Sequence, residues 1–242
     1  VSARRAAISA GNTFVRDTDA TRLSWNRADL MRLERGVALD AARPALRTSM
    51  YRVFQKQLVQ FDRELNDMVY KMSDLFPEPE SENVGFYLTA PGSGHPFSAL
   101  MLDVMPDIAL WGSGSGQFFP RYSYRGVAAD AASLDVFEDG GSPTFERIDN
   151  VTDEILTDYK QSYGKVTKDD IFFYVYGLLH SREYRDEFEA DLMKMLPRIP
   201  KVTAFKQFVE AGRALSELHL NYETAALYPL TENAKPDASL RV

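Results

Sequence analysis

The chain has 242 residues, 45% of them hydrophobic and 26% charged, a globular composition with enough residues for one large or two small domains. The absence of cysteine excludes disulfides, thiolate metal sites and a cysteine nucleophile, and it fits a cytoplasmic protein. No run of about 18 apolar residues is present, which excludes a membrane-spanning helix.

The formal net charge of −7 argues weakly against a nucleic-acid binder, but the charge is unevenly distributed. Residues 1–76 carry a balance of +4, residues 77–150 a balance of −8, and residues 151–224 a balance of −3. Basic charge therefore lies in the first third of the chain. The three histidines are far apart in the sequence and offer little material for a metal site.

The first third of the chain contains three kinds of segment. Residues 1–45 are rich in Ala and Arg, and we interpret them as a connector that leaned on a preceding domain. From that interpretation and from the first residue, Val1, we expect the chain to be a piece of a longer protein. Residues 46–63 carry two apolar and aromatic runs typical of β-structure. From residue 64 the apolar spacing changes to that of a short helix, which ends before Pro77.

The middle of the chain is predicted to consist of strands and loops. Glycine and serine clusters predict loops at 90–96 and 112–116, and the stretch 126–150 has the composition of a long acidic linker. The short strands are expected at 84–88, 100–104, 108–111 and 118–124.

The last third is predicted to be helical. Thr167 and Asp170 have the spacing of a capping box at the start of a central helix that is hydrophobic nearly all round. Gly177, in the middle of that helix, is expected to let a neighbouring element approach closely. The four expected helices are 152–163, which Gly164 ends, 167–179, 181–196, which Ser181 caps, and 203–222.

These patterns together predict an α+β fold. A mixed-sheet α/β subdomain at 46–150 is expected to precede a helical bundle at 151–224, with an extended tail at 225–242.

Several motifs have a catalytic interpretation and a structural one. His180 has the setting of a helix-end histidine that bonds carbonyls, and a general base is the weaker alternative because no nucleophile motif accompanies it. Asp103 and Asp107 are interpreted as turn caps rather than as an acid/base pair or metal ligands. The glycine clusters match neither GxGxxG nor a P-loop, so we interpret them as turns.

Interleaved basic and aromatic residues form the only constellation that suits nucleic-acid contact. Arginine can bond phosphates or guanine, and Gln55 or Gln57 could pair with adenine. The alternative is a sheet with core aromatics and merely solvated charges. On the DNA hypothesis, Arg52→Ala and Arg121→Ala should weaken binding and leave folding intact. The candidate contacts are Arg47, Arg52, Lys56, Gln57, Arg63, Arg121, Tyr122, Tyr124 and Arg125.

Three strings carry a resemblance to a known family. They are SMYRVFQKQLVQFDRELNDMVYKMSDLFP at 49–77, DDIFFYVYGLLHSREYRDEF at 169–188, and LPRIP at 196–200 followed by AGRALSELHLNYE at 211–223. In this order they resemble the C-terminal target-recognition region of Type ISP single-polypeptide restriction–modification enzymes. The resemblance covers residues 14–224. One departure is Tyr51-Arg52-Val53-Phe54, where the family pattern has Tyr-Arg-Pro-Phe.

The resemblance implies a function for the chain and partners within a longer polypeptide. It implies recognition of a non-palindromic site in double-stranded DNA, so that adjoining methyltransferase and helicase domains can methylate an adenine at N6 and be licensed to translocate and cleave. It implies S-adenosylmethionine, ATP and Mg²⁺ for the longer enzyme. The chain itself has no methyltransferase Asn/Asp-Pro-Pro-Tyr, P-loop or nuclease motif, so we expect it to contain no catalytic residue, cofactor site or metal site. The alternative is a structural coupling module that binds DNA weakly.

Overall fold

The computed structural model of the chain describes residues 46–61, 68–112, 116–127 and 144–227, together with the single residues 31, 66 and 229. Nearly all of the expected connector 1–45, most of the tail 225–242 and the candidate residue Arg63 therefore lie outside the described residues. No helix within the described part of the chain is both long enough and apolar enough to cross a membrane.

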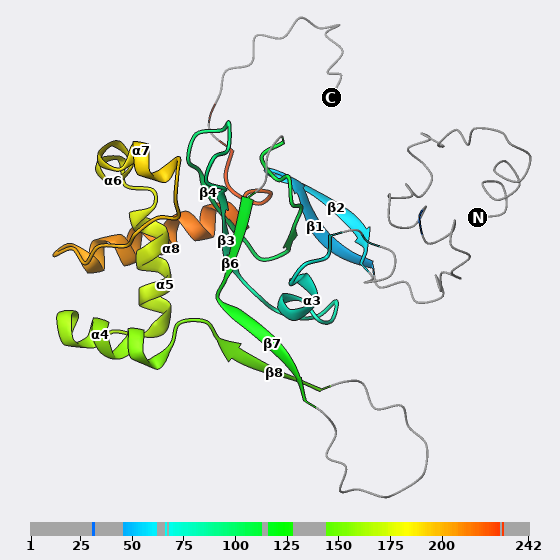
Figure 1. Cartoon of the computed structure of the whole chain (residues 1–242), viewed down its shortest axis with the longest axis horizontal. Coiled ribbons are helices and arrows are strands. Elements are labelled where there is room, and N and C mark those ends of the chain that lie inside the picture. The colour runs from blue at the N-terminus through cyan, green and yellow to red at the C-terminus, as the bar shows by residue number, and fades with distance from the viewer. Residues whose placement is uncertain are drawn as a thin grey trace, which may run out of the picture.

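The described chain has an α+β fold in which small sheets precede a group of C-terminal helices, as predicted (Figure 1). The strands are β1 (Leu46–Arg52), β2 (Gln55–Gln60), β3 (Gly85–Thr89), β4 (Ala99–Leu102), β5 (Met105–Pro106), β6 (Gly116–Pro120), β7 (Tyr122–Val127) and β8 (Thr144–Asp149). The helices are α3 (Met72–Leu75), α4 (Asp153–Tyr163), α5 (Lys168–Leu178), α6 (Arg182–Glu187), α7 (Glu189–Leu192) and α8 (Phe205–Leu220).

The strands of the described chain form three sheets. The first has the order β2-β1-β5, with an antiparallel β1–β2 hairpin and a short parallel pairing of β5 with β1. The second has the antiparallel order β4-β3-β6, and all five residues of β3 are buried. The third is the two-stranded antiparallel β7–β8 ribbon, which extends away from the helices in Figure 1. The strands predicted at 46–63, 84–88 and 100–104 are thereby confirmed.

Three predictions for the first two-thirds of the chain are wrong. The strand expected at 108–111 is a turn, because the Asp107 carboxylate accepts a hydrogen bond from the Ala109 amide at 2.8 Å and bends the chain. The strand expected at 118–124 divides at Arg121, so that β6 and β7 belong to different sheets. The acidic linker expected at 126–150 contains β8, which pairs with β7.

The helix expected from residue 64 to Pro77 is reduced to α3, which has four residues. Met68 and Tyr70, two of the residues just before it, have φ angles of 55° and 46°. These left-handed conformations are incompatible with a continuous α-helix and so delay its start.

The predicted helix boundaries in the last third are confirmed for α4 and α5. The Thr152 side chain accepts a hydrogen bond from the Ile155 amide, and Gly164, with φ 77°, ends α4. Thr167 and Asp170 form a reciprocal capping box at the start of α5. The helix expected at 181–196 is capped by Ser181 but is interrupted at Phe188, which separates α6 from α7.

Helices α5 and α8 cross with their backbones in contact. A Cβ atom added to Gly177 would lie 2.1 Å from the Phe208 carbonyl oxygen, and one added to Gly212 would lie 2.0 Å from the Phe173 carbonyl oxygen. The two glycines therefore allow an approach that no other residue permits at these positions, which confirms the prediction for Gly177.

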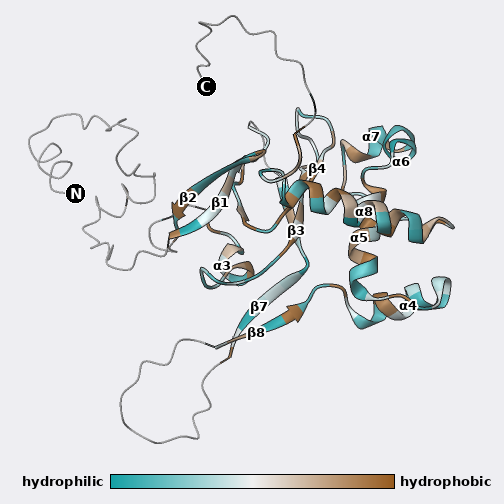
Figure 2. Cartoon of the chain, turned by 180° about the vertical axis from the view of Figure 1, so that it is seen from behind, coloured by the Kyte–Doolittle hydropathy of each residue, from teal (hydrophilic) through white to brown (hydrophobic). Residues whose placement is uncertain are grey.

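The main hydrophobic core joins the second sheet to these helices. Phe86 of β3 contacts Phe172 and Tyr176 of α5, with ring centroids 5.4 and 5.9 Å apart. The buried Tyr176 hydroxyl also accepts a hydrogen bond from the Met101 amide of β4 at 2.8 Å. Hydrophobic residues concentrate where β3, α5 and α8 meet (Figure 2), so sheet and helices share one interior.

We expect Gly177→Ala and Gly212→Ala to destabilise the chain by about 1–3 kcal/mol or more, because each new methyl group meets a backbone carbonyl that cannot move independently. The free energy of unfolding in denaturant measures the effect. Gly94→Ala is the matched control, since a Cβ there meets nothing within 4 Å and the backbone needs no positive φ. Equal stability of all three variants would contradict the close crossing.

Candidate nucleic-acid interface

The β1–β2 hairpin carries four of the candidate DNA contacts. The Arg52 guanidinium stacks 3.9 Å from the centroid of the Tyr51 ring and forms a 3.2 Å ion pair with Asp107. One-third of the Arg52 side chain remains exposed, and its two terminal nitrogens also donate to the Tyr51 carbonyl at 2.6 Å and to the Tyr51 hydroxyl at 3.3 Å. Gln57 of β2 is exposed.

Lys56, on the same hairpin, is tied to the end of α8. Its ammonium lies 2.8 Å from the Glu223 carboxylate and 5.2 Å from the Tyr222 ring centroid. The hydrogen bond to Glu223 raises the pKa of Lys56 above its ordinary value. Phe54, in the turn of the hairpin, also contacts the Tyr222 ring, at 4.8 Å between centroids. The hairpin is therefore held in a fixed position relative to the helices.

Arg47 lies on the same strand as Arg52 but is turned inward. Its guanidinium donates to the Phe76 carbonyl and, at 2.9 Å, to the Pro77 carbonyl, and it lies 5.1 Å from the Phe61 ring centroid. Burial lowers the pKa of Arg47. Backbone carbonyls of the chain thus occupy the donors that a phosphate would need.

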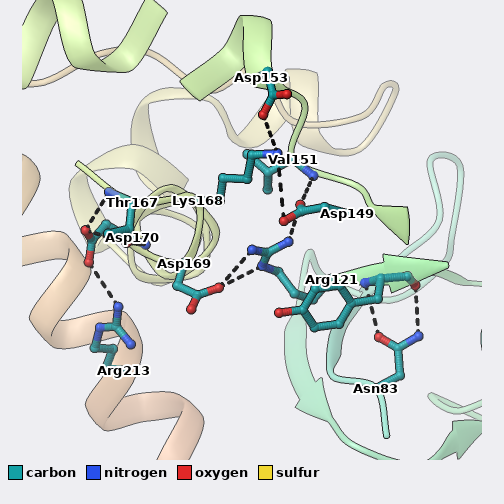
Figure 3. A network of polar contacts seen from close by, with 11 residues as sticks. Asn83, Arg121, Asp149, Val151, Asp153, Thr167, Lys168, Asp169, Asp170 and Arg213 are labelled. Atoms are coloured by element: carbon teal, nitrogen blue, oxygen red, sulfur yellow. Dashed lines mark hydrogen bonds and ion pairs between the residues drawn. The ribbon is translucent and has the colours of Figure 1, made fainter. Parts of the chain in front are cut away.

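Arg121, which the sequence predicted to contact DNA, is buried in the structure, so its guanidinium is not exposed to a duplex. The residue is 4% exposed and occupies the junction between β6 and β7. Its guanidinium forms ion pairs with Asp149 at the end of β8 and, at 2.9 Å, with Asp169 in the first turn of α5 (Figure 3). One arginine thereby joins the root of the ribbon to the central helix.

The surrounding charges continue this network. Lys168 lies 2.7 Å from Asp153 and 3.9 Å from Asp149, and it links the start of α4 to the start of α5. Burial opposes the ionisation of Asp149, but hydrogen bonds from Arg121 and from the Val151 amide hold its pKa below the ordinary value. Asp149 therefore remains ionised opposite the Arg121 guanidinium near neutral pH.

Asn83 fixes the other side of the ribbon root. The residue is 6% exposed, and its side-chain amide bonds both backbone groups of Tyr122, donating to the carbonyl at 2.8 Å and accepting from the amide at 3.2 Å. Two residues further along β7, the Tyr124 hydroxyl donates to the Glu82 carbonyl. Tyr122 and Tyr124, both predicted as DNA contacts, are thus half-buried and help to hold β7 against the segment before β3.

The outer half of the ribbon presents two arginines. Arg125 and Arg147 are both exposed, and neither forms an ion pair with a residue that the structure describes. The Arg147 guanidinium lies 4.4 Å from the centroid of the Tyr122 ring. Arg147 was missing from the predicted contacts because its segment was interpreted as a linker; the pattern Thr-Phe-Glu-Arg-Ile-Asp was the available signal for a strand.

The residues with alternative catalytic interpretations have structural contacts. His180 Nδ1 lies 2.9 Å from the Tyr176 carbonyl, and burial lowers the pKa of His180. Asp107 caps the turn described above, as the sequence indicated. Across the candidate interface, the β-strands present guanidinium, ammonium and amide donors, which are the groups that bond phosphates and base edges in protein–DNA complexes.

We expect Arg121→Met to destabilise the chain by about 1–3 kcal/mol, because it leaves Asp149 and Asp169 without their shared partner. The folded-state pKa of Asp149 lies below its ordinary value of 3.8, so the ion pair stabilises the fold above that pH. This contribution is lost as the pH falls from there through the folded-state pKa. The free energies of unfolding of the parent protein and of Arg121→Met, measured in denaturant, should differ less and less as the pH is lowered from 7 to 3.

Arg182→Met is the control, since Arg182 is 90% exposed and pairs only with Asp186 four residues later among the described residues. Its effect on the free energy of unfolding should stay within about 0.5 kcal/mol at every pH. An Arg121→Met protein as stable as the parent at neutral pH would contradict the structural role of Arg121.

Comparison with known proteins identifies the family. Residues 2–242 match the Type ISP C-terminal specificity domain. Three solved structures are similar, and the chain spans only 13 to 21% of their lengths. The Type ISP enzyme LlaBIII bound to DNA is 31% identical over 87% of this chain, with a TM-score of 0.69. A nuclease-deletion mutant of the Type ISP enzyme LlaGI, in complex with a DNA substrate mimic, is 30% identical over 88%, with a TM-score of 0.65.

The third structure, a DrdV–DNA complex, is 27% identical over 96% of the chain, with a TM-score of 0.73 and 21% of that protein covered. A comparison with curated proteins gave no match. The match to the family extends over both the strands and the helices described above. The chain therefore belongs to the family of Type ISP C-terminal specificity domains.

Proposed function

We propose that this domain recognises a specific sequence in double-stranded DNA on behalf of a longer Type ISP restriction–modification polypeptide. The observation that carries the proposal is that the LlaBIII and LlaGI structures, which are 30 to 31% identical over 87 to 88% of this chain, are complexes with DNA or a DNA substrate mimic. The exposed donors on the β-strands supply the chemistry for such contacts.

The β1–β2 hairpin is one contact surface in this proposal. Arg52 is preorganised by its stack on Tyr51, so it can bond a phosphate or a guanine without losing much side-chain freedom. Gln57 is exposed on β2 and could form paired hydrogen bonds with an adenine. Lys56 adds a cation that is partly neutralised by Glu223. These three residues stay candidates, whereas Arg47 and Arg121 support the surface from within.

Binding would position a non-palindromic site so that the methyltransferase of the longer polypeptide can methylate an adenine at N6. Such a methyltransferase must rotate its target base out of the duplex, which requires the duplex to be held in register by contacts on either side. The same binding would license translocation and cleavage. In this scheme the longer polypeptide uses S-adenosylmethionine, ATP and Mg²⁺, and this domain contributes specificity.

A second candidate function is a coupling module that docks on the methyltransferase and motor domains and binds DNA weakly. The net charge of −7 favours it, because phosphates repel a chain with this charge at long range. Exposed apolar side chains near α6 and α7 offer a docking surface for another domain; they are Phe188, Met193, Met195 and Leu196.

We expect the purified chain to select a preferred sequence from a randomised duplex pool, with an affinity that falls steeply with salt. Arg52→Ala should weaken binding to the selected duplex by about 1–3 kcal/mol while leaving the melting temperature nearly unchanged, since Arg52 is only partly buried. Arg182→Ala, which removes an exposed arginine from α6, is the control for charge loss. If the chain and the longer polypeptide both bind all sequences in the pool equally, the proposal is wrong.

Exchange of residues 46–150 between two members of the family separates the two candidate functions. If this part recognises DNA, the methylated sequence should follow the exchanged segment, which methylation mapping of DNA modified by the complete polypeptide would detect. A coupling module predicts instead that the methylated sequence stays with the recipient.

A further inference from the structure

The β7–β8 ribbon projects from the domain and is fixed at its root, two features that suit an element that contacts a ligand. An isolated two-stranded ribbon is marginally stable, so its direction must be fixed by its surroundings. Arg121, Asn83 and Asp149 fix it at the root with part-buried ion pairs and paired hydrogen bonds, and Arg121 and Asn83 are themselves buried. The ribbon projects from the body of the domain in both views (Figures 1 and 2).

Burial changes along the ribbon in a regular way. The residues of β7 pass from half-buried at Tyr122–Tyr124 to exposed at Arg125–Val127, and β8 runs the opposite way. The root half thus belongs to the domain, and the outer half, Arg125–Val127 with Thr144–Arg147, is presented to solvent. This outer half carries Arg125 and Arg147, with Glu146 as its one described acidic residue.

The two arginines lie on opposite faces of the ribbon. Arg147 is directly opposite Tyr124, so the two side chains share a face with Tyr122, two residues before Tyr124. Arg125 is opposite Glu146 on the other face. The guanidinium of Arg147 is restrained by the Tyr122 ring, whereas that of Arg125 has no ring beneath it among the described residues.

We infer that the outer half of this ribbon enters a groove of the DNA duplex, where Arg147 bonds a base edge and Arg125 bonds a phosphate. The inference deepens the proposed function and depends on it. The major groove of B-DNA admits a two-stranded β-ribbon. A guanidinium restrained by stacking is preorganised for the two parallel hydrogen bonds that identify guanine, while an unrestrained one suits a phosphate, which needs no fixed geometry.

The charge of the ribbon sets how it would approach the duplex. Residues 128–143, which connect the two strands, carry four carboxylates and no basic residue in the sequence. Phosphates repel a segment of this charge. We therefore assign the contact with the duplex to the described strands, Arg125–Val127 and Thr144–Arg147, and not to that connection.

The experiment compares arginine variants on the two faces. The wild-type chain first selects its preferred duplex from a randomised pool, and the dissociation constants of the preferred and a scrambled duplex are then measured over a range of salt concentrations. Arg147→Ala should reduce discrimination between the two duplexes by roughly 5- to 150-fold, the range for loss of one base contact. Arg125→Ala should weaken both complexes alike and reduce the salt slope by about 1.

Two further variants complete the test. Arg147→Lys keeps the charge but lacks the planar fork, so discrimination should fall while the salt slope stays unchanged. Arg182→Ala removes an exposed arginine from α6 and should change neither quantity. Circular dichroism and thermal melting of each variant verify that the fold is intact; both ribbon arginines are exposed, so their loss should leave it so.

The outcomes separate the inference from the proposed function. If the wild-type chain selects a sequence but Arg147→Ala and Arg147→Lys keep full discrimination, the inference is overturned and the proposed function stands. Equal, uniform losses in Arg147→Ala and Arg125→Ala overturn the assignment of a base contact to Arg147. If neither the wild-type chain nor the longer polypeptide selects a sequence, both are overturned.

Discussion

The contact between the backbones of α5 and α8 is the constraint on which the rest of the structure depends. At this crossing each of two glycines, Gly177 and Gly212, faces a carbonyl oxygen of the other helix, and a single added carbon atom would prevent the approach. The adjacent Tyr176 ties the same turn of α5 to Met101 of β4. The crossing thus sets the distance of α8 from the second sheet, and with it the position of the residues after α8 that hold the β1–β2 hairpin.

A second constraint runs from α5 to the ribbon. Asp169 is in the first turn of α5, where the helix dipole favours a carboxylate, and its partner Arg121 is at the point where the chain leaves the second sheet. Arg121 is buried but the Asp169 side chain is half exposed, and desolvation of the arginine offsets much of the attraction between the two charges. The contribution of this ion pair is therefore better understood as directional. Together with Asn83, Arg121 determines where β7 points.

Local patterns predicted the helical part of the fold well and the β part incompletely. Caps such as Thr167 and the close-approach glycine Gly177 depend on a few neighbouring residues, so sequence spacing reveals them. The partition of strands into sheets depends on distant partners: nothing near β8 indicates that it pairs with β7 across a 16-residue connection that resembles a linker. The candidate contacts show the same limit. Arg121 and Arg125 lie beside tyrosines in the sequence and Arg47 lies four residues before Tyr51, yet only the structure shows that Arg47 and Arg121 are turned inward.

A chain with a net charge of −7 can still contact DNA if its cations stand apart from its carboxylates. Six residues of strand extend about 20 Å, and the Debye length at physiological salt is about 8 Å, so charges at the root of the ribbon are largely screened at its far end. Within the described residues of that half, two arginines outnumber Glu146. The acidic body then discourages binding of phosphates to the helices, and in our proposal the two exposed arginines of the described strands are the local cations that contact the duplex. An overall negative charge, on this argument, restricts where the duplex can bind and does not prevent binding.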